Sequence, residues 1–511
     1  MTHSAVLAID LGTSSVKSLI VDSEGRVLGR GTSLFPVQRP LPGWAEQRPD
    51  DWWRATREAV SFAFLQANRP ELAAIGLAGQ MHGTVVLDEG YQPLLPAIIW
   101  EDQRSTEEID EITRVVSPSR YQQIAGTAPF PGFQIATLRW LINHEPSTWQ
   151  LVKHVLLPKD YIRFKLTGEI ASDPGDGSGT AMLDVNTRGW SKEITSALDI
   201  DRDLLPSLSN SHETTGLLSH SAATELGLRS GIHVVAGTGD APAAALACGA
   251  ADSRTMAITI SSGSQAIRST SSPHPDSKGR WHTWCNCLSS ETGAGWYHMA
   301  ATMASGVALR WLRDAILTIN SFHADRLLDD LGGQVPAGAG GLVFVPYLTG
   351  ERTPHMDSSA RGAFLGLSIS HDRRHMVRAV MEGSVFALHE AATLIDSAAG
   401  PASRLVLTGG GSRSRLWTQI VADVFQQPIH VNLEPDGSAL GAAILAATGA
   451  GWFTAVEGST SWVRLSDPIE PATANAVIYQ ALEEIYQGYY EAHKRDFSAL
   501  GTVLARSAIC P

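Results

Sequence analysis

The stretch AIDLGTSSVK (residues 8–17) decides which fold the N-terminal part of the chain is expected to adopt. An apolar run ends at one acid, Asp10, and a Gly/Thr/Ser cluster follows before apolar residues resume. Such a cluster between two strand-like runs is typical of a hairpin turn. The same turn presents several backbone N–H groups and hydroxyls at one place, and concave arrangements of this kind bind phosphate. The stretch alone leaves both interpretations open.

The residues around this stretch predict strands that alternate with helices. Apolar runs separated by turn residues predict short strands at residues 5–9, 16–21, 27–34, 72–78 and 84–87. A helix is expected to begin near Pro49, and its apolar face is formed by Trp52, Thr56, Ala59, Val60 and Ala63. This mixture indicates an α/β layer rather than a β-sandwich.

The second half of the chain begins with the same strand-turn-strand pattern as residues 4–21. The segment RTMAITISSGSQAIRST (254–270) is again an apolar strand, a Ser/Gly turn and a second strand. A chain of 511 residues is also too long for a single core. We therefore expect two related α/β domains at residues 1–248 and 249–450, followed by a helical extension at 451–511 with an amphipathic helix over 473–498.

Composition and charge limit the classes of partner. A net charge of −13 and a pI near 5.7 argue against nucleic acid. The sequence shows no apolar run long enough to span a bilayer and no basic N-terminal segment, so neither membrane binding nor a signal peptide is expected. The four cysteines suit a reducing compartment, and the single residue between Cys285 and Cys287 is too short a spacing for a zinc half-site. A cytoplasmic protein is expected.

Two further glycine-rich loops suggest a nucleotide site. In VVAGTGDAPAAALACG (234–249), a strand runs into Gly-Thr-Gly, and Asp240 follows at the start of a helix. Asp240 there is either a helix cap or a carboxylate that takes a proton from a hydroxyl. LTGGGSRSRLW (407–417) is a strand, a glycine triplet and a helix start. Three such loops suit a nucleotide with two or three phosphates, although no Walker-type G-x-x-x-x-G-K-[ST] motif is present.

Three other segments place polar groups beside tryptophans. They are PGWAEQ (42–47), GLAGQMHG (76–83) and WEDQR (100–104). Their polar side chains are Glu46, Gln80, His82, Glu101 and Asp102, and the aromatic neighbours are Trp44 and Trp100. Polar groups beside an aromatic wall suit a polyol. His82 alone is equally well explained as a loop histidine with satisfied hydrogen bonds.

Taken in order, these segments resemble the FGGY carbohydrate kinases over residues 5–450. The resemblance rests on IDLGTSSVK, GWAEQ, GLAGQMHG, LLPKDYIRFKLTGEIASD (156–173), GTGDA, PYLTGERTPH (346–355) and TGGGSRS. It implies two actin/hexokinase-like (ribonuclease H-like) ATPase domains with a cleft between them. It also implies ATP and Mg²⁺ as cofactors, and a small sugar and ATP as partners, and it leaves a homodimer open.

The resemblance implies roles for residues at matching positions. Asp240 would be the catalytic base, and Asp10 together with Asp240 would position Mg²⁺. Met81 and His82 would contact the sugar, with Gln80, Trp44, Glu46 and Asp102 around them. The residues expected to bind ATP are Gly12, Thr13 and Ser14 in the first phosphate loop, Ser261, Ser262 and Gly263 in the second, and Gly410 and Gly411 under the adenosine.

The implied reaction is ATP-dependent phosphorylation of a ketopentose, with D-xylulose giving D-xylulose 5-phosphate as the first choice. WEDQR differs from the family's usual segment by carrying Glu101 and Gln103. A kinase of another sugar or polyol, such as ribulose or a tetritol, is the alternative. An actin-like ATPase or sugar sensor that does not transfer phosphate is a third interpretation, which the presence of Asp240 disfavours.

Overall fold

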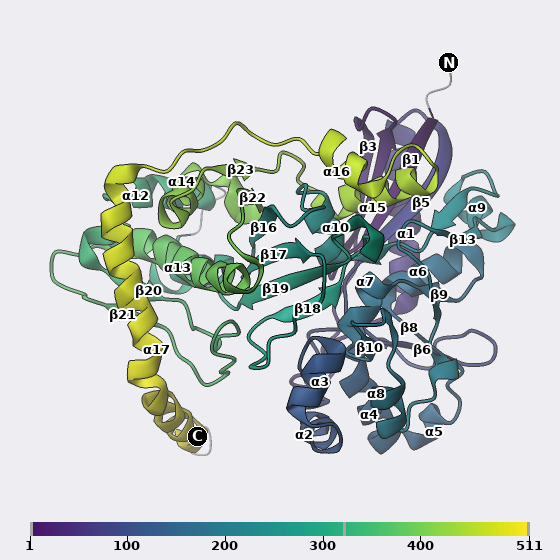
Figure 1. The fold of residues 1–511 in the computed structure, drawn as a ribbon, viewed down its shortest axis with the longest axis horizontal. Coiled ribbons are helices and arrows are strands. Elements are labelled where there is room, and N and C mark those ends of the chain that lie inside the picture. Colours follow the sequence, from purple (N-terminus) through teal and green to yellow (C-terminus); the bar gives the residue numbers. More distant parts are fainter. Residues whose placement is uncertain (1–3, 320–322, 508–511) are drawn as a thin grey trace. The chain divides into compact units, whose positions relative to one another are not determined.

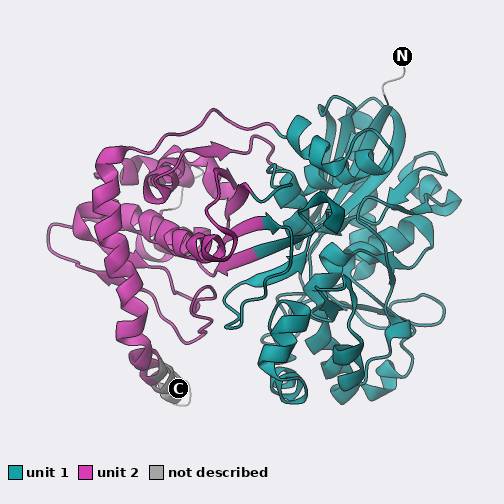
Figure 2. Ribbon diagram, viewed as in Figure 1, with its two compact units in different colours: residues 1–253, 269–298, 436–463 teal, residues 254–268, 299–435, 464–511 magenta. Residues whose placement is uncertain are grey.

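The computed structural model describes residues 4–319 and 323–507 (Figure 1). Its contacts divide the chain into two compact units (Figure 2). Unit 1 comprises residues 1–253, 269–298 and 436–463, and unit 2 comprises residues 254–268, 299–435 and 464–511. The units are therefore built from segments that are not contiguous in sequence. The expected division at 1–248, 249–450 and 451–511 stays a prediction about evolutionary domains.

Unit 1 is built on a seven-stranded mixed sheet of order β13-β14-β5-β1-β2-β3, in which β15 also pairs with β5. Its strands are β1 (Ser4–Leu11), β2 (Ser15–Asp22), β3 (Val27–Leu34), β5 (Glu71–Gly79), β13 (Thr214–Leu217), β14 (His233–Val235) and β15 (Thr238–Gly239). β1 is antiparallel to β2, with Ala8 opposite Leu19, and parallel to β5, with Ala8 opposite Gly76. The strands predicted in the first 90 residues are confirmed.

Helices cover both faces of this sheet. In β1, Leu7 and Ile9 belong to the core cluster that includes α1 (Pro49–Gln66), whereas Val6 and Ala8 pack in the cluster formed with α15 (Gly437–Gly449). This alternation follows from the period of two in a strand. Gly76 allows the close approach of α15, because a Cβ there would lie 2.0 Å from the carbonyl oxygen of Ala442. The predicted helix face of α1 is buried, as expected.

The remaining elements of unit 1 are short helices and two- to four-residue strands. The helices are α2 (Thr106–Val115), α3 (Pro118–Ala125), α4 (Gln134–His144), α5 (Pro146–Trp149), α6 (Pro158–Thr167), α7 (Pro174–Gly177), α8 (Lys192–Ala197), α9 (His220–Leu226), α10 (Asp240–Leu246) and α16 (Ala455–Ser461). The short strands are β4 (Glu46–Gln47), β6 (Val85–Leu87), β7 (Ala97–Ile98), β8 (His154–Leu156), β9 (Ala171–Ser172), β10 (Leu183–Asp184), β11 (Gly189–Trp190), β12 (Ser207–Leu208) and β18 (His282–Cys285).

A second mixed sheet has six strands in the order β18-β19-β17-β16-β22-β23, and most of its residues belong to unit 2. Besides β18, these strands are β16 (Thr255–Ile260), β17 (Ser264–Thr270), β19 (Trp296–Thr302), β22 (Arg404–Thr408) and β23 (Ile429–Val431). β16 and β17 form an antiparallel hairpin, and β16 runs parallel to β22. The predicted strand-turn-strand at 254–270 is therefore confirmed, and both units are α/β.

The helices of unit 2 include one that is longer than expected. They are α11 (Gly306–Trp311), α12 (Ala324–Gly333), α13 (Arg373–Ala399), α14 (Arg415–Phe425) and α17 (Thr473–Ser507), with a hairpin of β20 (Val343–Val345) and β21 (Ala363–Leu365). The terminal helix was expected to end at residue 498 and continues to Ser507. Among the described residues, no helix combines the length and the hydropathy needed to cross a membrane.

Candidate active site

Asp10 lies at the end of β1, directly before the first Gly/Thr/Ser turn. The turn is closed by a hydrogen bond of 3.0 Å from the Gly12 N–H to the Ser15 carbonyl. The Asp10 side chain is buried, its Oδ2 accepts a hydrogen bond from the Ser438 hydroxyl, and its Oδ1 has no hydrogen-bond partner among the described residues. Burial raises the pKa of Asp10. A buried carboxylate oxygen without a donor is suited to a cation.

Thr13 joins this turn to the three segments that were expected to bind the sugar. Its carbonyl accepts a hydrogen bond of 2.6 Å from Gln47 Nε2, and its hydroxyl accepts one of 3.0 Å from Trp100 Nε1. Gln47 Oε1 in turn accepts from Gln80 Nε2 at 2.9 Å and from Trp52 Nε1 at 3.0 Å. The first Gly/Thr/Ser turn is therefore connected to all three segments, through Gln47 of PGWAEQ, Gln80 of GLAGQMHG and Trp100 of WEDQR.

Asp240 is the first residue of α10, and the N-cap position itself is occupied by Gly239. The side chain is half-buried. Burial and the nearby charge of Asp10 raise the pKa of Asp240 to about 7, although the N–H groups of Ala241 and Asp240 itself act in the opposite direction. The structure thus brings Asp10 and Asp240 into one electrostatic site, with a carboxyl group whose pKa suits proton transfer near neutral pH.

Met81 and His82 lie beside the segment that carries Asp240. Met81 is buried against Gly239, where an added Cβ would be 2.7 Å from Met81 Cγ. His82 has a left-handed backbone with φ of 75°, which a side chain rarely adopts. Its ring stacks on Phe133 with centres 4.1 Å apart, and its Nδ1 is 2.5 Å from the Gly179 carbonyl oxygen. These contacts fix the direction of the His82 ring.

An aromatic wall continues from His82 and was not predicted. Phe133 lies 6.3 Å from Trp284 between ring centres, and Trp284 stacks on His282 with centres 4.5 Å apart. The hydroxyl of Thr127 is 2.7 Å from His282 Nδ1. His282 and Trp284 alternate along β18, so a period of two in WHTWC contained a signal for this shared face. An aromatic face of this kind suits the C–H faces of a sugar.

Arg104 organises the remaining acids of the expected sugar site and was also missed. Its guanidinium is bonded to Glu46 Oε1 at 2.7 Å and to Asp102 Oδ2 at 2.8 Å. It also stacks over Trp44, with Cζ 3.5 Å from the ring centre. Asp102 is fully buried and accepts a further hydrogen bond from the Ala45 N–H at 2.6 Å. Asp102 Oδ1 accepts from the backbone N–H and the Nε–H of Arg104, both at 2.9 Å, so both oxygens of Asp102 are occupied within the protein and any effect of Asp102 on a ligand would act through Arg104.

Glu101 takes a different position from its neighbour Asp102. It is partly exposed and forms an ion pair with Arg39. The WEDQR segment therefore sends one acid inward and one outward. Glu101, the acid by which WEDQR differs from the family's usual segment, is paired with Arg39 and is not part of the buried cluster of Arg104, Glu46 and Asp102.

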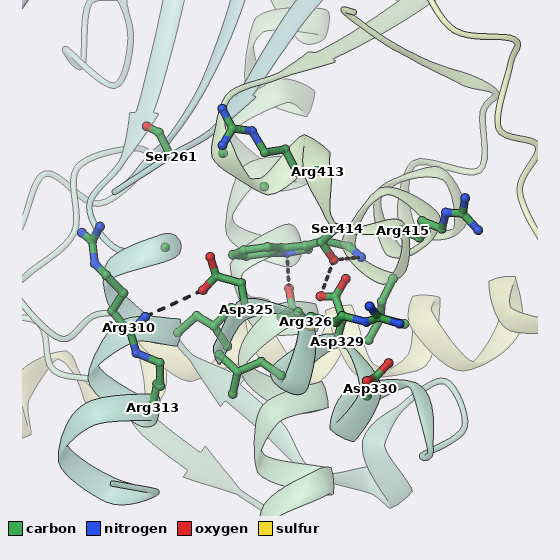
Figure 3. Close-up of a pocket in the computed structure, with 18 of the residues that line it drawn as sticks. Ser261, Arg310, Arg313, Asp325, Arg326, Asp329, Asp330, Arg413, Ser414 and Arg415 are labelled. Carbon is green, nitrogen blue, oxygen red and sulfur yellow. Dashed lines mark hydrogen bonds and ion pairs between the residues drawn. The ribbon is translucent and has the colours of Figure 1, made fainter. Parts of the chain in front are cut away.

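The loop of Ser261–Gly263 and the glycine triplet loop at 409–411 contribute to one pocket of unit 2, with a volume of about 1110 Å³ (Figure 3). Ser261, Ser262, Gly410 and Gly411 contribute to its wall. The Ser262 hydroxyl accepts a hydrogen bond of 3.2 Å from Arg310 Nη2, which places a cation directly at the second loop. Gly263 stabilises that loop, because its carbonyl oxygen accepts a hydrogen bond of 2.8 Å from the Ser261 N–H.

Charged residues from α11, the segment after it, α12, the turn at Gly410–Arg413 and the start of α14 complete this pocket, and the sequence patterns did not reveal them. They include Arg310, Arg313, Asp325, Asp329, Arg413 and Arg415 (Figure 3). The Ser414 hydroxyl donates to Asp329 Oδ1 at 2.7 Å, which anchors the start of α14 next to the glycine triplet. Arginines at a Gly/Ser-rich loop can neutralise phosphate oxygens.

The chain matches two domain models of one protein family over most of its length. The profile described as the FGGY family of carbohydrate kinases, N-terminal domain, matches residues 5–247, and the C-terminal domain profile of the same family matches residues 256–450. A xylulose kinase of Staphylococcus xylosus is 34% identical over 487 residues, which cover 95% of this chain and 99% of the relative. A gluconokinase of Bacillus subtilis (strain 168) is 28% identical over 492 residues, 94% of this chain and 95% of the relative.

A solved structure shows the same fold over nearly the whole chain. The crystal structure of xylulose kinase from Rhodospirillum rubrum superimposes with a TM-score of 0.89 at 29% sequence identity, covering 97% of this chain and 100% of that chain. Two domain profiles of one family match the chain, and the relatives align over nearly its whole length, so the family of the chain is established. The chain belongs to the FGGY family of carbohydrate kinases, which makes it an ATP-dependent sugar kinase.

Proposed function

We propose that this kinase transfers the γ-phosphoryl group of ATP to the C5 hydroxyl of D-xylulose and releases D-xylulose 5-phosphate and ADP. The observation that carries the proposal is geometric: Asp10 on β1 and Thr238, two residues before Asp240, pair with the same residue of β5, Ala78, and Met81 packs on Gly239, all within unit 1. The names of relatives at 34% identity over nearly the full chain support the choice of sugar.

Asp240 acts in this proposal as the general base. Its half-buried carboxylate orients the sugar hydroxyl and takes its proton as the oxygen attacks the γ-phosphorus. The bond from the γ-phosphorus to the β,γ-bridging oxygen breaks, and ADP leaves. Phosphoryl transfer needs positioning and charge neutralisation more than covalent participation of the protein. A pKa of about 7 leaves Asp240 ionised in a large fraction of molecules at neutral pH.

Asp10 and Asp240 fit a Mg²⁺ ion. Asp10 offers a buried Oδ1 without a hydrogen-bond donor, and the charges of the two carboxyls act on each other. Within residues 4–319 and 323–507, no group of three or more His, Cys, Asp or Glu side chains could hold a metal ion. The rest of the shell would then come from phosphate oxygens and water, as Mg²⁺ commonly prefers. When bound, the ion would neutralise charge on the transferring phosphoryl group.

The phosphate groups of ATP are assigned to two loops. The turn of Gly12, Thr13 and Ser14 offers N–H groups and hydroxyls next to Asp10. Ser261, Ser262 and Gly263 offer the same kinds of donor, with Arg310 beside Ser262. Gly410 and Gly411 line the same pocket of unit 2 and are assigned to the adenosine.

The sugar site favours an uncharged substrate over an aldonate, although one relative is a gluconokinase. Glu46 and Asp102 bring two carboxylates to the site, and the guanidinium of Arg104 is already bonded to both. A substrate carboxylate placed there would add a third negative charge beside the single guanidinium, whose donors are already engaged by the two acids. Repulsion and lost hydrogen bonds would both oppose its binding.

A coupled assay of ADP release with a panel of substrates tests this choice. D-xylulose, D-ribulose, a tetritol and D-gluconate are compared at saturating ATP and Mg²⁺. We expect the largest kcat/KM for D-xylulose and no measurable turnover of D-gluconate. A larger kcat/KM for D-ribulose or a tetritol would preserve the sugar kinase assignment and refute D-xylulose as the substrate. Efficient turnover of D-gluconate would refute the argument from the two acids.

A further inference from the structure

Lys159 is a fully buried cation in unit 1 that the reaction described above does not use. Its Nζ lies 2.6 Å from Asp160 Oδ1, 3.2 Å from Asp173 Oδ1 and 3.8 Å from Asp176 Oδ2. Burial alone would lower the pKa of Lys159, but the charges of these three carboxyls outweigh it, and the ammonium stays protonated. Buried ion clusters are costly to desolvate, so such a cluster calls for a reason beyond simple stability.

The ammonium group binds the segment that carries Asp240 directly. Lys159 Nζ donates a hydrogen bond of 3.2 Å to the carbonyl oxygen of Ala236, four residues before Asp240. The carbon chain of Lys159 is also close to this segment. An added Cβ on Gly79 would lie 3.0 Å from Lys159 Cβ, and Gly79 pairs with Gly239 in the sheet.

A second series of contacts connects Lys159 to the same segment through Asp173. The Asp173 Oδ2 atom accepts hydrogen bonds from the Ser211 hydroxyl at 2.7 Å and from the Gly175 N–H at 3.0 Å. The Ser211 carbonyl accepts from the Gly237 N–H at 2.9 Å. Gly175 packs tightly on Thr238, because an added Cβ would be 2.3 Å from Thr238 Oγ1.

From these contacts we infer that Lys159 is a positioning residue for Asp240. Through Ala236 and through Asp173 it holds the 236–240 segment in the place that the proposed reaction requires. A carboxylate that is displaced by a fraction of an ångström loses alignment with the reacting hydroxyl, and misalignment lowers turnover more than binding. This inference rests on the proposed role of Asp240 as the base.

The test compares Lys159→Met with the matched control Arg163→Met, measured on the full chain. Arg163 is also a fully buried cation of α6, and it binds the carbonyl groups of Glu169 and Ala171 and the Thr215 hydroxyl. We expect Lys159→Met to lower kcat by about tenfold or more, with the KM for MgATP changed less than about twofold. Arg163→Met is expected to lower the melting temperature with kcat changed less than about threefold.

Hydrogen exchange gives a second readout that does not depend on activity. In Lys159→Met, amides 236–240 are expected to exchange at least about tenfold faster, whereas in Arg163→Met they exchange as in the parent protein. Asp240→Asn is assayed in parallel. If Asp240→Asn keeps its turnover, the proposed base is wrong, and the exchange data still decide whether Lys159 anchors the segment.

A double variant, Lys159→Met with Asp173→Asn, guards against simple failure to fold, because it removes the cation together with one acid. We expect the same loss of kcat and the same faster exchange. Parent-like kcat and exchange in either folded Lys159 variant would overturn the inference. Failure of both Lys159 variants to fold, while Arg163→Met folds, would also overturn it, because the role of Lys159 would then be general stability.

Discussion

The side-chain amide of Gln47 donates a hydrogen bond of 2.6 Å to the carbonyl oxygen of Thr13. This contact joins the first Gly/Thr/Ser turn to the strand that carries Glu46, and the same glutamine accepts a hydrogen bond from Gln80, next to Met81. One buried side chain therefore links the groups assigned to phosphate with the groups assigned to sugar. Loss of this link should disturb both substrates together.

Gln47→Leu keeps the size of the side chain and removes its hydrogen bonds. It leaves Gln80 and Trp52 without their buried acceptor, a loss of about 1–3 kcal/mol for each unpaired group. We expect the KM values for MgATP and for the sugar to rise by about threefold or more. Gln66→Ala, which removes an exposed hydrogen bond to the Arg30 N–H, is the control and should leave both KM values unchanged. A rise in only one KM would refute the coupling.

Asp10→Ala tests the assignment of Asp10 to the metal side. Turnover with MgATP should fall by about 10²-fold or more, because the buried oxygen that we assign to the cation is lost. Sugar binding, measured by calorimetry without nucleotide, should change little. Ser438→Ala removes only the hydrogen bond to Asp10 Oδ2 and should have a much smaller effect. Equal loss of turnover and sugar binding would instead indicate that the β1–β2 hairpin is misfolded.

His82→Ala tests substrate choice. The ring is fixed by Phe133 and by the Gly179 carbonyl, so it presents one geometry to the sugar hydroxyls. In the parent protein we expect D-xylulose to exceed D-ribulose in kcat/KM by roughly tenfold or more, and His82→Ala should reduce that ratio. The control is His154→Ala, which removes a histidine stacked on Tyr91 and should preserve the ratio. A ratio that survives the loss of His82 would remove this residue from the recognition site.

Glu351 gives a prediction for the dependence of stability on pH. Burial raises the pKa of Glu351 to about 8, although N–H groups of Met303 and Arg352 donate to its Oε1 at 2.8 Å. The folded chain thus holds this proton up to about pH 8, whereas the unfolded chain releases it near its usual pKa of about 4.3. The folded state binds more protons in this window, so Glu351 makes stability fall as pH rises, by up to about 1.4 kcal/mol per pH unit.

Glu351→Gln should remove that contribution. Thermal unfolding between pH 5 and pH 8 is the measurement, and the variant should lose less melting temperature over this range than the parent. Glu71→Gln, at the exposed start of β5, is the control and should keep the slope of the parent. The same slope in Glu351→Gln and in the parent would show that Glu351 is ionised in the folded protein.

The sequence predicted those parts of the site that depend on neighbours along the chain. The turn at Gly12, the start of α10 at Asp240 and the glycine loop at Gly410 are local patterns of strand, turn and helix, and the structure has all three. Their chemical roles remain the predictions that the experiments above address.

The parts that the sequence did not predict depend on contacts between distant segments. Phe133 meets His82 only because α4 begins beside the GQMHG turn, and Trp284 comes from more than 200 positions further along the chain. Lys159 is an ordinary lysine in the motif PKDYI, and its burial among three carboxyls depends on α7 and on the loop before α10. The period of two in WHTWC places His282 and Trp284 on one face of β18, but no periodic signal shows which distant residues that face meets.

Asp240→Asn decides whether Asp240 is the base of the reaction. The substitution keeps the size of the side chain and removes its basicity, and Gly239 still occupies the N-cap of α10. In the ADP-release assay with D-xylulose we predict that kcat falls by about 10²–10⁴ while sugar affinity, measured by calorimetry, changes less than about threefold. Turnover within about threefold of the parent protein would contradict the account and would leave Asp240 with a structural role in the first turn of α10.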